Sequence, residues 1–183
     1  MHQLESDKEL PEFDIDRIFC EAAMNQSHWK LIKRKMEKKG TNFLIHLAIF
    51  VEPYLKYILE GKKTVESRFS VNRIAPYKKV HRGDIVLLKR SGGPIVGLCM
   101  ITDVWFYRLD PKTWLNIKKE FSQYLCVQDP SFWSARENAS YATLMKLGHI
   151  IRIEPTIYKK RDRRGWVVLN SREKTSKLRI DDF

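Results

Sequence analysis

A short segment near the middle of the chain gathers side chains that can bind or act on a polar ligand. The segment Gly61–Arg68 (GKKTVESR) contains two adjacent lysines, a threonine, a glutamate and an arginine. If the segment is extended, Thr64, Glu66 and Arg68 lie on one side of it, because successive side chains alternate between faces. Lys63 then points to the other side unless the chain bends. With such a bend, the segment predicts a carboxylate held between a lysine and an arginine.

Each of these groups suits the recognition of a nucleobase or a phosphate. Glu66 can accept a hydrogen bond from the exocyclic amino group of a base, and Arg68 can stack on a base or hold a phosphate. Lys63 can stabilise an oxyanion or act as a base. A structural role is the alternative, in which Glu66 and Arg68 form an ion pair that fixes the loop while Lys62 and Lys63 are solvated.

A second cluster of cations precedes the last apolar stretch of the chain. Lys159–Arg164 (KKRDRR) contains five basic residues and one aspartate. A turn with this charge can contact a phosphate backbone, so we expect Arg161, Arg163 and Arg164 to hold phosphates. A solvated hairpin tip is the alternative. Trp166 begins an apolar strand and is expected in the core.

Two aromatic residues are candidates for stacking on a base. Modified-base readers enclose the base between aromatic rings, and Trp133 and Tyr141 can supply such rings. Trp133 lies in the irregular stretch 129–134, and loop residues often carry binding functions. Core packing is the alternative for both residues.

Metal and cofactor motifs are lacking in the sequence. The five histidines have no ligand spacing, and the three cysteines form no C-x-x-C pair. His46 and His149 fall in predicted strands and are expected to be satisfied core groups. No P-loop, G-x-S-x-G or G-x-G-x-x-G motif is present. We therefore expect no metal and no other cofactor.

Composition and charge narrow the class of protein. The chain has 183 residues, 34 basic and 22 acidic, for a net charge of +12. The length suits one domain. The positive surplus lies in residues 29–43, 44–109 and 151–183, whereas residues 1–28 are acidic. Such clustering favours a basic surface for a polyanion over charge that serves solubility alone.

The same sequence features suggest a compartment. No apolar run reaches the roughly 18 residues of a membrane span, and the polar N-terminus is unlike a signal peptide. An odd number of widely spaced cysteines suits a reducing environment. We expect a cytoplasmic protein without a membrane partner.

The elements that must position the GKKTVESR segment follow from periodicity and turn residues. Apolar residues at three- and four-residue steps predict one N-terminal helix from Asp14 to the stop signal Gly40, with a basic second half. Residues 110–147 have helical tendency. The predicted helices are 14–39, 53–59, 112–119 and 135–147, and the predicted strands are 43–50, 84–89, 95–106, 149–155 and 166–169. Ser91–Pro94 forms the turn of a hairpin, and Gly97 is a possible bulge. This order indicates an α+β fold with a small, mostly antiparallel sheet or barrel.

The GKKTVESR segment and its surroundings resemble a known domain. Val51–Glu60 (VEPYLKYILE) followed by Gly61–Arg68 is similar to the opening of ASCH domains, and His81–Leu88 (HRGDIVLL) resembles the family's entry to its second strand. The resemblance covers about residues 44–170. It implies a PUA-like β-barrel with flanking helices, a fold shared with RNA-binding PUA domains and modified-base readers of the YTH and EVE type.

The resemblance divides the chain into three parts. These are a tail and amphipathic basic helix over residues 1–42, an ASCH, PUA-like domain over residues 43–170, and a polar C-terminal tail over residues 171–183. It also implies RNA or nucleotide binding through a basic cleft, with a modified base as one candidate ligand. The expected nucleic-acid contacts are Lys62, Lys63, Thr64, Glu66, Arg68, Arg161, Arg163, Arg164, Trp133 and Tyr141.

Two other functions stay open at this point. Some small bacterial ASCH proteins are hydrolases, and one removes the acetyl group from N4-acetylcytidine. Its catalytic lysine corresponds to Lys63, whereas its catalytic threonine corresponds to Glu66 here. A nucleoside amidohydrolase or ribonuclease using Lys63 and Glu66 is therefore one alternative. The other is a coactivator-type protein–protein module whose basic N-terminal helix docks on an acidic partner.

Overall fold

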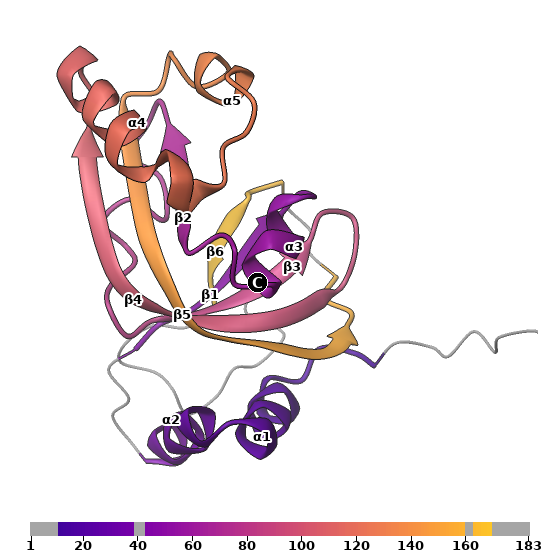
Figure 1. The fold of residues 1–183 in the computed structure, drawn as a ribbon. Helices are drawn as coiled ribbons and strands as arrows, with labels where there is room; N and C mark the ends of the chain where they lie inside the picture. Colours follow the sequence, from indigo (N-terminus) through magenta and orange to yellow (C-terminus); the bar gives the residue numbers. More distant parts are fainter. Residues whose placement is uncertain (1–10, 39–42, 160–162, 170–183) are drawn as a thin grey trace, which may run out of the picture.

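One strongly curled sheet organises the chain in the computed structural model, which describes residues 11–38, 43–159 and 163–169 (Figure 1). The helices are α1 (Ile15–Asn25), α2 (Ser27–Glu37), α3 (Tyr54–Leu59), α4 (Pro111–Leu125) and α5 (Ser131–Ser134). The strands are β1 (Ile45–Phe50), β2 (Val65–Ser70), β3 (Ile85–Arg90), β4 (Ile95–Arg108), β5 (Tyr141–Thr156) and β6 (Trp166–Val168).

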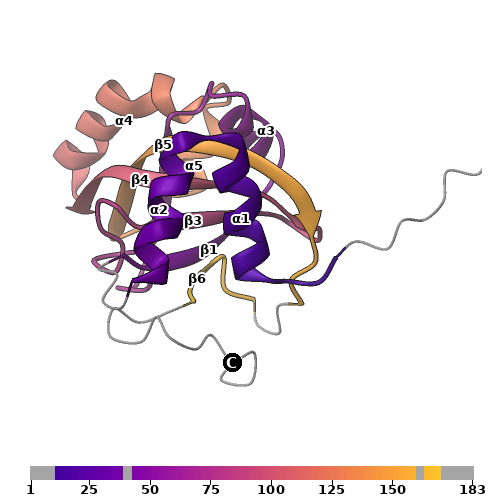
Figure 2. The same ribbon diagram turned by 90° about the horizontal axis from the view of Figure 1, so that it is seen from below.

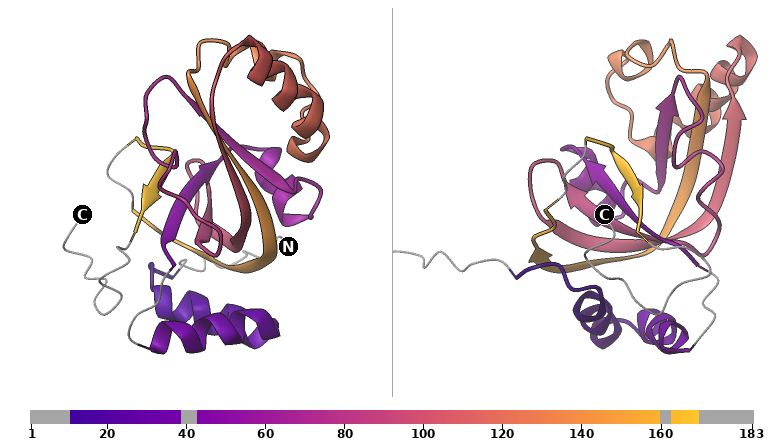
Figure 3. Two further views of the ribbon diagram at one scale, coloured as in Figure 1. Left: turned by 90° about the vertical axis from the view of Figure 1, so that its left-hand side faces the viewer. Right: turned by 180° about the vertical axis from the view of Figure 1, so that it is seen from behind.

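The strand order is β2-β5-β4-β3-β1-β6, which leaves β2 and β6 at the two edges. Only the β1–β3 pair is parallel among the pairs of this sheet that the structure describes, so the α+β, mostly antiparallel prediction is confirmed. The long strands β4 and β5 curl the sheet into a half-barrel, which the side view shows most clearly (Figure 3). The curl turns the two edges toward each other.

Three apolar clusters hold helices and loops on this sheet. Helices α1 and α2 cover the convex face over β1, β3 and β5 (Figure 2), where Phe19 and Trp29 are buried. Helix α4 covers β2 and β5 with Ile117 and Phe121. The third cluster fills the inside of the curl, and it includes Leu55 and Ile58 of α3.

The predicted single N-terminal helix is two helices. Gln26 has an extended backbone (φ −145°, ψ 134°), and the chain turns there between α1 and α2. The apolar period continues across the break because only one residue leaves the helix. The turn lets both helices lay their apolar faces, which include Phe19 and Trp29, on the same sheet.

The predicted helix over residues 135–147 is wrong, because β5 begins at Tyr141. Helix α4 packs on one face of this strand and the cluster inside the curl packs on the other, so residues 142–145 are all buried. A short apolar run of this kind does not distinguish a central strand from a buried helix. Gly148, expected to stop a helix, instead allows close approach of β4: a Cβ there would lie 2.5 Å from Thr102 Cγ2.

Other local predictions are confirmed or extended. Strands β3 and β4 form the predicted hairpin, and its register shifts beside Gly97. Helix α4 continues to Leu125, beyond the predicted end at 119; the Asp110 side chain caps its start by accepting from Thr113 N. No helix among the described residues is long and apolar enough to span a membrane. The described part of the chain also contains no cluster of three or more His, Cys, Asp or Glu suited to a metal.

Candidate functional site

A bend after α3 brings Lys63 to Glu66. Gly61 has a left-handed backbone (φ 72°), and the amides of Lys62 and Lys63 both donate to the Tyr57 carbonyl. The Lys63 Nζ then lies 3.2 Å from Glu66 Oε2 and donates to the Val65 carbonyl at 2.6 Å. The bend thus places Lys63 on the inner side of β2, beside Glu66.

Both charged groups are buried inside the curl. Lys63 is 3% exposed and Glu66 is 6% exposed, so neither is an ordinary solvated surface residue. The inner face of β2 also carries Arg68. Its Nε lies 2.8 Å from Glu66 Oε1, so the two groups form an ion pair, but the Nε–H bond does not point at the oxygen well enough for a hydrogen bond. Glu66 therefore lies between two cations: alternation places Arg68 on its side of β2, and the bend at Gly61 brings Lys63 to it.

Arg68 also joins the two edges of the curled sheet. Its Nη2 donates to the Ile49 carbonyl at 2.8 Å, and its Nη1 donates to the Gly165 carbonyl at 3.3 Å. The guanidinium carbon lies 5.0 Å from the centre of the Phe50 ring and 5.4 Å from that of Trp166. These contacts give Arg68 a structural role, in agreement with the alternative in which it fixes the local chain.

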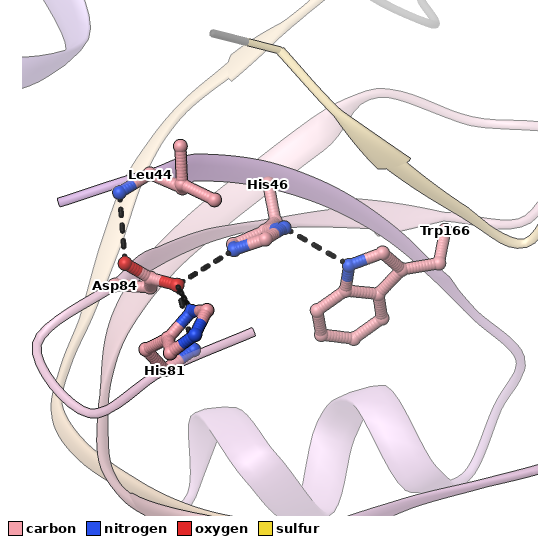
Figure 4. A network of polar contacts seen from close by, with 5 residues as sticks. All are labelled: Leu44, His46, His81, Asp84 and Trp166. Atoms are coloured by element: carbon pink, nitrogen blue, oxygen red, sulfur yellow. Dashed lines mark hydrogen bonds and ion pairs between the residues drawn. The ribbon is translucent and has the colours of Figure 1, made fainter. Parts of the chain in front are cut away.

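A buried polar network anchors the Trp166 ring that lies beside Arg68 (Figure 4). The indole Nε1 of Trp166 donates to His46 Nδ1 at 3.1 Å, and His46 Nε2 lies 3.1 Å from Asp84 Oδ2. Because an indole can only donate, His46 Nδ1 is unprotonated and the ring proton is on Nε2, where it donates to Asp84. His46 is thus a satisfied core group, as expected.

Asp84 is the centre of this network. Its Oδ1 accepts from Leu44 N at 2.8 Å, and its Oδ2 accepts from His81 N at 2.7 Å as well as from His46 (Figure 4). Asp84 and His46 are both fully buried. The network links the starts of β1 and β3 to the beginning of β6, and so fixes one wall of the Glu66–Arg68 region.

Two further residues reach the site from α3 and from the chain after α5. The Tyr54 ring centre lies 5.7 Å from Lys63 Nζ, and the Phe132 ring lies 6.1 Å from Tyr54. Arg136 lies over Phe132, with its guanidinium carbon 3.8 Å from the ring centre. Sequence reasoning missed Tyr54 and Arg136, because neither belongs to a motif or a periodic charge pattern.

The charged groups around Glu66 also affect the pKa of the Arg136 guanidinium. Burial lowers this pKa, and the charge of Arg68 lowers it further, whereas Tyr54 and Glu66 act in the opposite direction. Arg136 is therefore close enough to sense both members of the Glu66–Arg68 pair. The described site contains Lys63 and Arg68 beside the carboxylate of Glu66, and Arg136 is connected to it through the Phe132 and Tyr54 rings.

The other residues of the predicted site lie around this group with different roles. Lys62 is exposed and pairs with Glu60 at 2.7 Å, which raises the pKa of Lys62. Thr64 contributes backbone bonds, donating to the Tyr124 carbonyl and accepting from Leu147 N. Neither contact brings its side chain to Glu66.

The two candidate stacking rings pack against other aromatic residues. Trp133 lies 5.0 Å from Phe132 and 5.8 Å from Trp114, in the group that packs under α4. Tyr141 lies 4.9 Å from Tyr77 and bonds Arg73, a hydrogen bond that raises the pKa of Arg73. The packing accounts for both rings, and their contact with a base stays a prediction.

The C-terminal arginines lie just before β6. Arg163 and Arg164 are exposed and precede Gly165, whose carbonyl accepts from Arg68. Arg161 lies outside the described residues. His149, expected in the core, is exposed and stacks on His28 with ring centres 3.4 Å apart.

Comparisons with known proteins agree with this arrangement. The family model "ASCH domain" matches residues 49–173. A crystal structure of ASCH from Zymomonas mobilis has a TM-score of 0.56 at 14% identity, covering 70% of this chain and 90% of that one. A serine-to-alanine mutant of that protein gives a TM-score of 0.57 at 14% identity, covering 72% and 92%. No curated protein sequence matches the chain. The structural likeness confirms the predicted PUA-like fold.

Proposed function

The chain belongs to the ASCH domain family, and we propose that it binds RNA or a nucleotide at the group formed by Lys63, Glu66 and Arg68. The observation that carries this proposal is the burial of the Lys63–Glu66 pair, whose atoms lie 3.2 Å apart inside the curl. Burying an ion pair costs desolvation energy, so such a pair is weak evidence for stability. A buried pair of opposite charges in a known domain motif is therefore a candidate for function.

The chemistry of the group supports a nucleobase as the ligand. Glu66 can accept from an exocyclic amino group, and Lys63 can donate to a ring nitrogen or carbonyl of the base. Tyr54 and Trp166 supply aromatic surface next to these charges. A modified base is one member of this ligand class.

The charge of the chain supports a phosphate backbone as part of the ligand. The net charge is +12, and the exposed Arg163 and Arg164 lead directly into Gly165 beside Arg68. Cations that replace condensed counterions on RNA supply most of a nonspecific affinity. We propose that these arginines contact phosphates next to the bound base.

The test is a binding titration with a matched pair of lysine variants. Full-length protein is titrated with a fluorescein-labelled, mixed-sequence single-stranded RNA and with cytidine monophosphate, over a range of salt concentrations. Lys63→Met is expected to raise the Kd by at least about tenfold, the value of one lost charged hydrogen bond. Lys62→Met removes the same charge from the adjacent exposed position, and we expect it to change the Kd far less.

Folding controls accompany this titration. Lys63→Met leaves Glu66 with one cation fewer in a buried position, so the variant Lys63→Met/Glu66→Gln removes both charges together. Circular dichroism shows whether each variant keeps its fold. If the wild-type protein binds neither RNA nor the nucleotide at low salt, the proposed function is wrong.

A hydrolase is the second candidate, and the contact between Lys63 and Glu66 favours it. Nζ of Lys63 donates to the Val65 carbonyl and faces Glu66, so the ammonium suits the stabilisation of an oxyanion better than the removal of a proton. Acetate release from N4-acetylcytidine and cleavage of labelled RNA test this candidate. Turnover that is lost in Lys63→Met and kept in Lys62→Met supports it, and absence of turnover in the wild-type protein contradicts it.

A further inference from the structure

Arg136 is a half-buried cation without a carboxylate partner in the described part of the chain. Its Nη1 donates to the Phe132 carbonyl at 2.6 Å, and its guanidinium plane lies over the Phe132 ring. None of the ion pairs between described residues involves Arg136. The hydrogen bond and the ring hold the guanidinium in place, but neither neutralises its charge.

The position of Arg136 relates it to the site. Phe132 lies 6.1 Å from Tyr54, and Tyr54 lies 5.7 Å from Lys63 Nζ. Helix α5 and the chain that follows it lie on the same side of the curled sheet as α3 (Figure 1). The pKa of Arg136 is sensitive to Glu66 and to Arg68, which agrees with this placement.

The charges of this group do not cancel. Lys63, Arg68 and Arg136 are three cations, and Glu66 is the carboxylate between the first two. The desolvation of this partly buried guanidinium costs free energy in the unliganded protein. An anion bound between Arg136 and the Glu66 region would compensate this charge.

We propose that Arg136 holds a phosphate of the RNA or nucleotide whose base lies at Lys63 and Glu66. Among the described residues the guanidinium donates only to the Phe132 carbonyl, and a planar guanidinium matches two oxygens of a phosphate. This inference rests on the proposed function and adds to it the group that receives the phosphate. It also makes the chain after α5, which carries no motif, part of the binding surface.

The experiment compares Arg136→Gln with Arg34→Gln, a change of the same charge at an exposed position of α2 on the far face of the sheet. For the labelled single-stranded RNA, Arg136→Gln is expected to raise the Kd about tenfold. The slope of log K against log salt becomes shallower by about 0.7, the value for one phosphate on a single strand. Arg34→Gln is expected to leave both quantities close to those of the wild-type protein.

Two further measurements identify where the bound phosphate comes from and whether the Arg136 side chain has a structural role. Cytidine and cytidine monophosphate are compared: wild type prefers the monophosphate, and Arg136→Gln loses this preference while still binding cytidine. If only the RNA affinity falls, the phosphate that Arg136 holds belongs to the polymer. Urea unfolding of Arg136→Gln is expected to show a stability equal to or above that of the wild-type protein, because a desolvated charge is removed.

The outcomes distinguish this inference from the proposed function. If the wild-type protein binds RNA and Arg136→Gln has the same Kd and salt slope, Arg136 does not hold a phosphate, while the proposed function stands. If Arg136→Gln is clearly less stable and loses cytidine together with the monophosphate, Arg136 is structural and the inference is wrong. If the wild-type protein binds no probe, both fail.

Discussion

Replacing Asp84 with alanine removes a buried carboxylate that receives hydrogen bonds from three parts of the fold. The three donors are Leu44 N, His81 N and His46 Nε2. The carboxylate is fully buried, so its loss leaves these donors without water as a ready substitute. The variant therefore isolates the contribution of this network to stability.

The magnitude follows from the number of donors. Each buried donor that loses its partner costs about 1–3 kcal/mol. Relaxation and the entry of water reduce the sum over these donors, so we expect Asp84→Ala to lower the free energy of unfolding by about 3–5 kcal/mol. A domain is typically stable by about 5–15 kcal/mol, so this loss is a large part of the total.

The milder substitution Asp84→Asn tests the same hydrogen bonds with a smaller expected loss of stability. The amide keeps the shape of the side chain but replaces one acceptor oxygen with a donor. Placing the new NH₂ group toward Leu44 N sacrifices one hydrogen bond, whereas the opposite orientation sacrifices those to His46 and His81. We expect the cheaper orientation and a loss of about 1.5–3 kcal/mol, the value of a hydrogen bond to a charged group.

The assay is equilibrium unfolding in urea, followed by tryptophan fluorescence and far-UV circular dichroism. Asp103→Ala is the matched control, because Asp103 is exposed and its side chain accepts from the adjacent Val104 N. The control is expected to change stability by less than about 0.5 kcal/mol. If Asp84→Ala costs no more than Asp103→Ala, the buried network does not hold this part of the fold. Nitrogen NMR of His46 is a second check: a protonated Nδ1 would contradict the tautomer derived from Trp166.

Two further predictions concern the edges of the sheet and the packing of α2. Arg68→Lys keeps the charge, but a lysine cannot donate to the carbonyls of Ile49 and Gly165 together as the planar guanidinium does. We expect the free energy of unfolding in urea to fall by about 1.5–3 kcal/mol. A wild-type urea midpoint would show that these two hydrogen bonds contribute nothing to stability. Burial, followed by the charges of His149 and Lys35, lowers the pKa of His28 below 6.5, so the unfolded chain binds the proton more readily. The contribution of His28 to stability is therefore complete above pH 6.5 and is lost as the pH falls through the lowered pKa of His28 in the folded protein. In this pH range, His28→Gln should make the urea midpoint depend less on pH. An unchanged pH profile would contradict the lowered pKa of His28.

The local part of the site was open to prediction because it is encoded in eight consecutive residues. Alternation along β2 places Glu66 and Arg68 on one face, and the structure has them 2.8 Å apart. The position of Lys63 depended on whether the chain bends. Gly61, in a left-handed conformation, supplies that bend, and it is the one residue of the segment for which this conformation carries little steric cost.

The error at residues 135–147 has a different cause. Helix α4 covers one face of β5 and the inner cluster covers the other, so residues 142–145 are buried in succession and the period of two is lost there. What remains is an apolar run that a helix would also bury. Tertiary position, which no local pattern records, decided the conformation.

The contacts that sequence reasoning missed join residues across long stretches of chain. His46 and Trp166 are 120 positions apart, and His46 and Asp84 are 38 positions apart. Arg136 reaches the site through a ring contact with Phe132 and not through a motif. Pairs of this kind have no spacing rule, because the sheet order brings them together only after β1, β3 and β6 are adjacent.

Stability and the proposed ligand recognition involve the same residues where the two edges of this half-barrel meet. Arg68 donates to the carbonyls of Ile49 and Gly165 and also pairs with Glu66. The Trp166 ring beside it is held by its hydrogen bond to His46. A variant of Arg68 or His46 that reduces ligand affinity therefore does not by itself locate a ligand contact. Arg136 does not bond across these edges, and its loss relieves a desolvated charge. For that reason, variants at Arg136 separate binding from folding more cleanly than variants at Arg68.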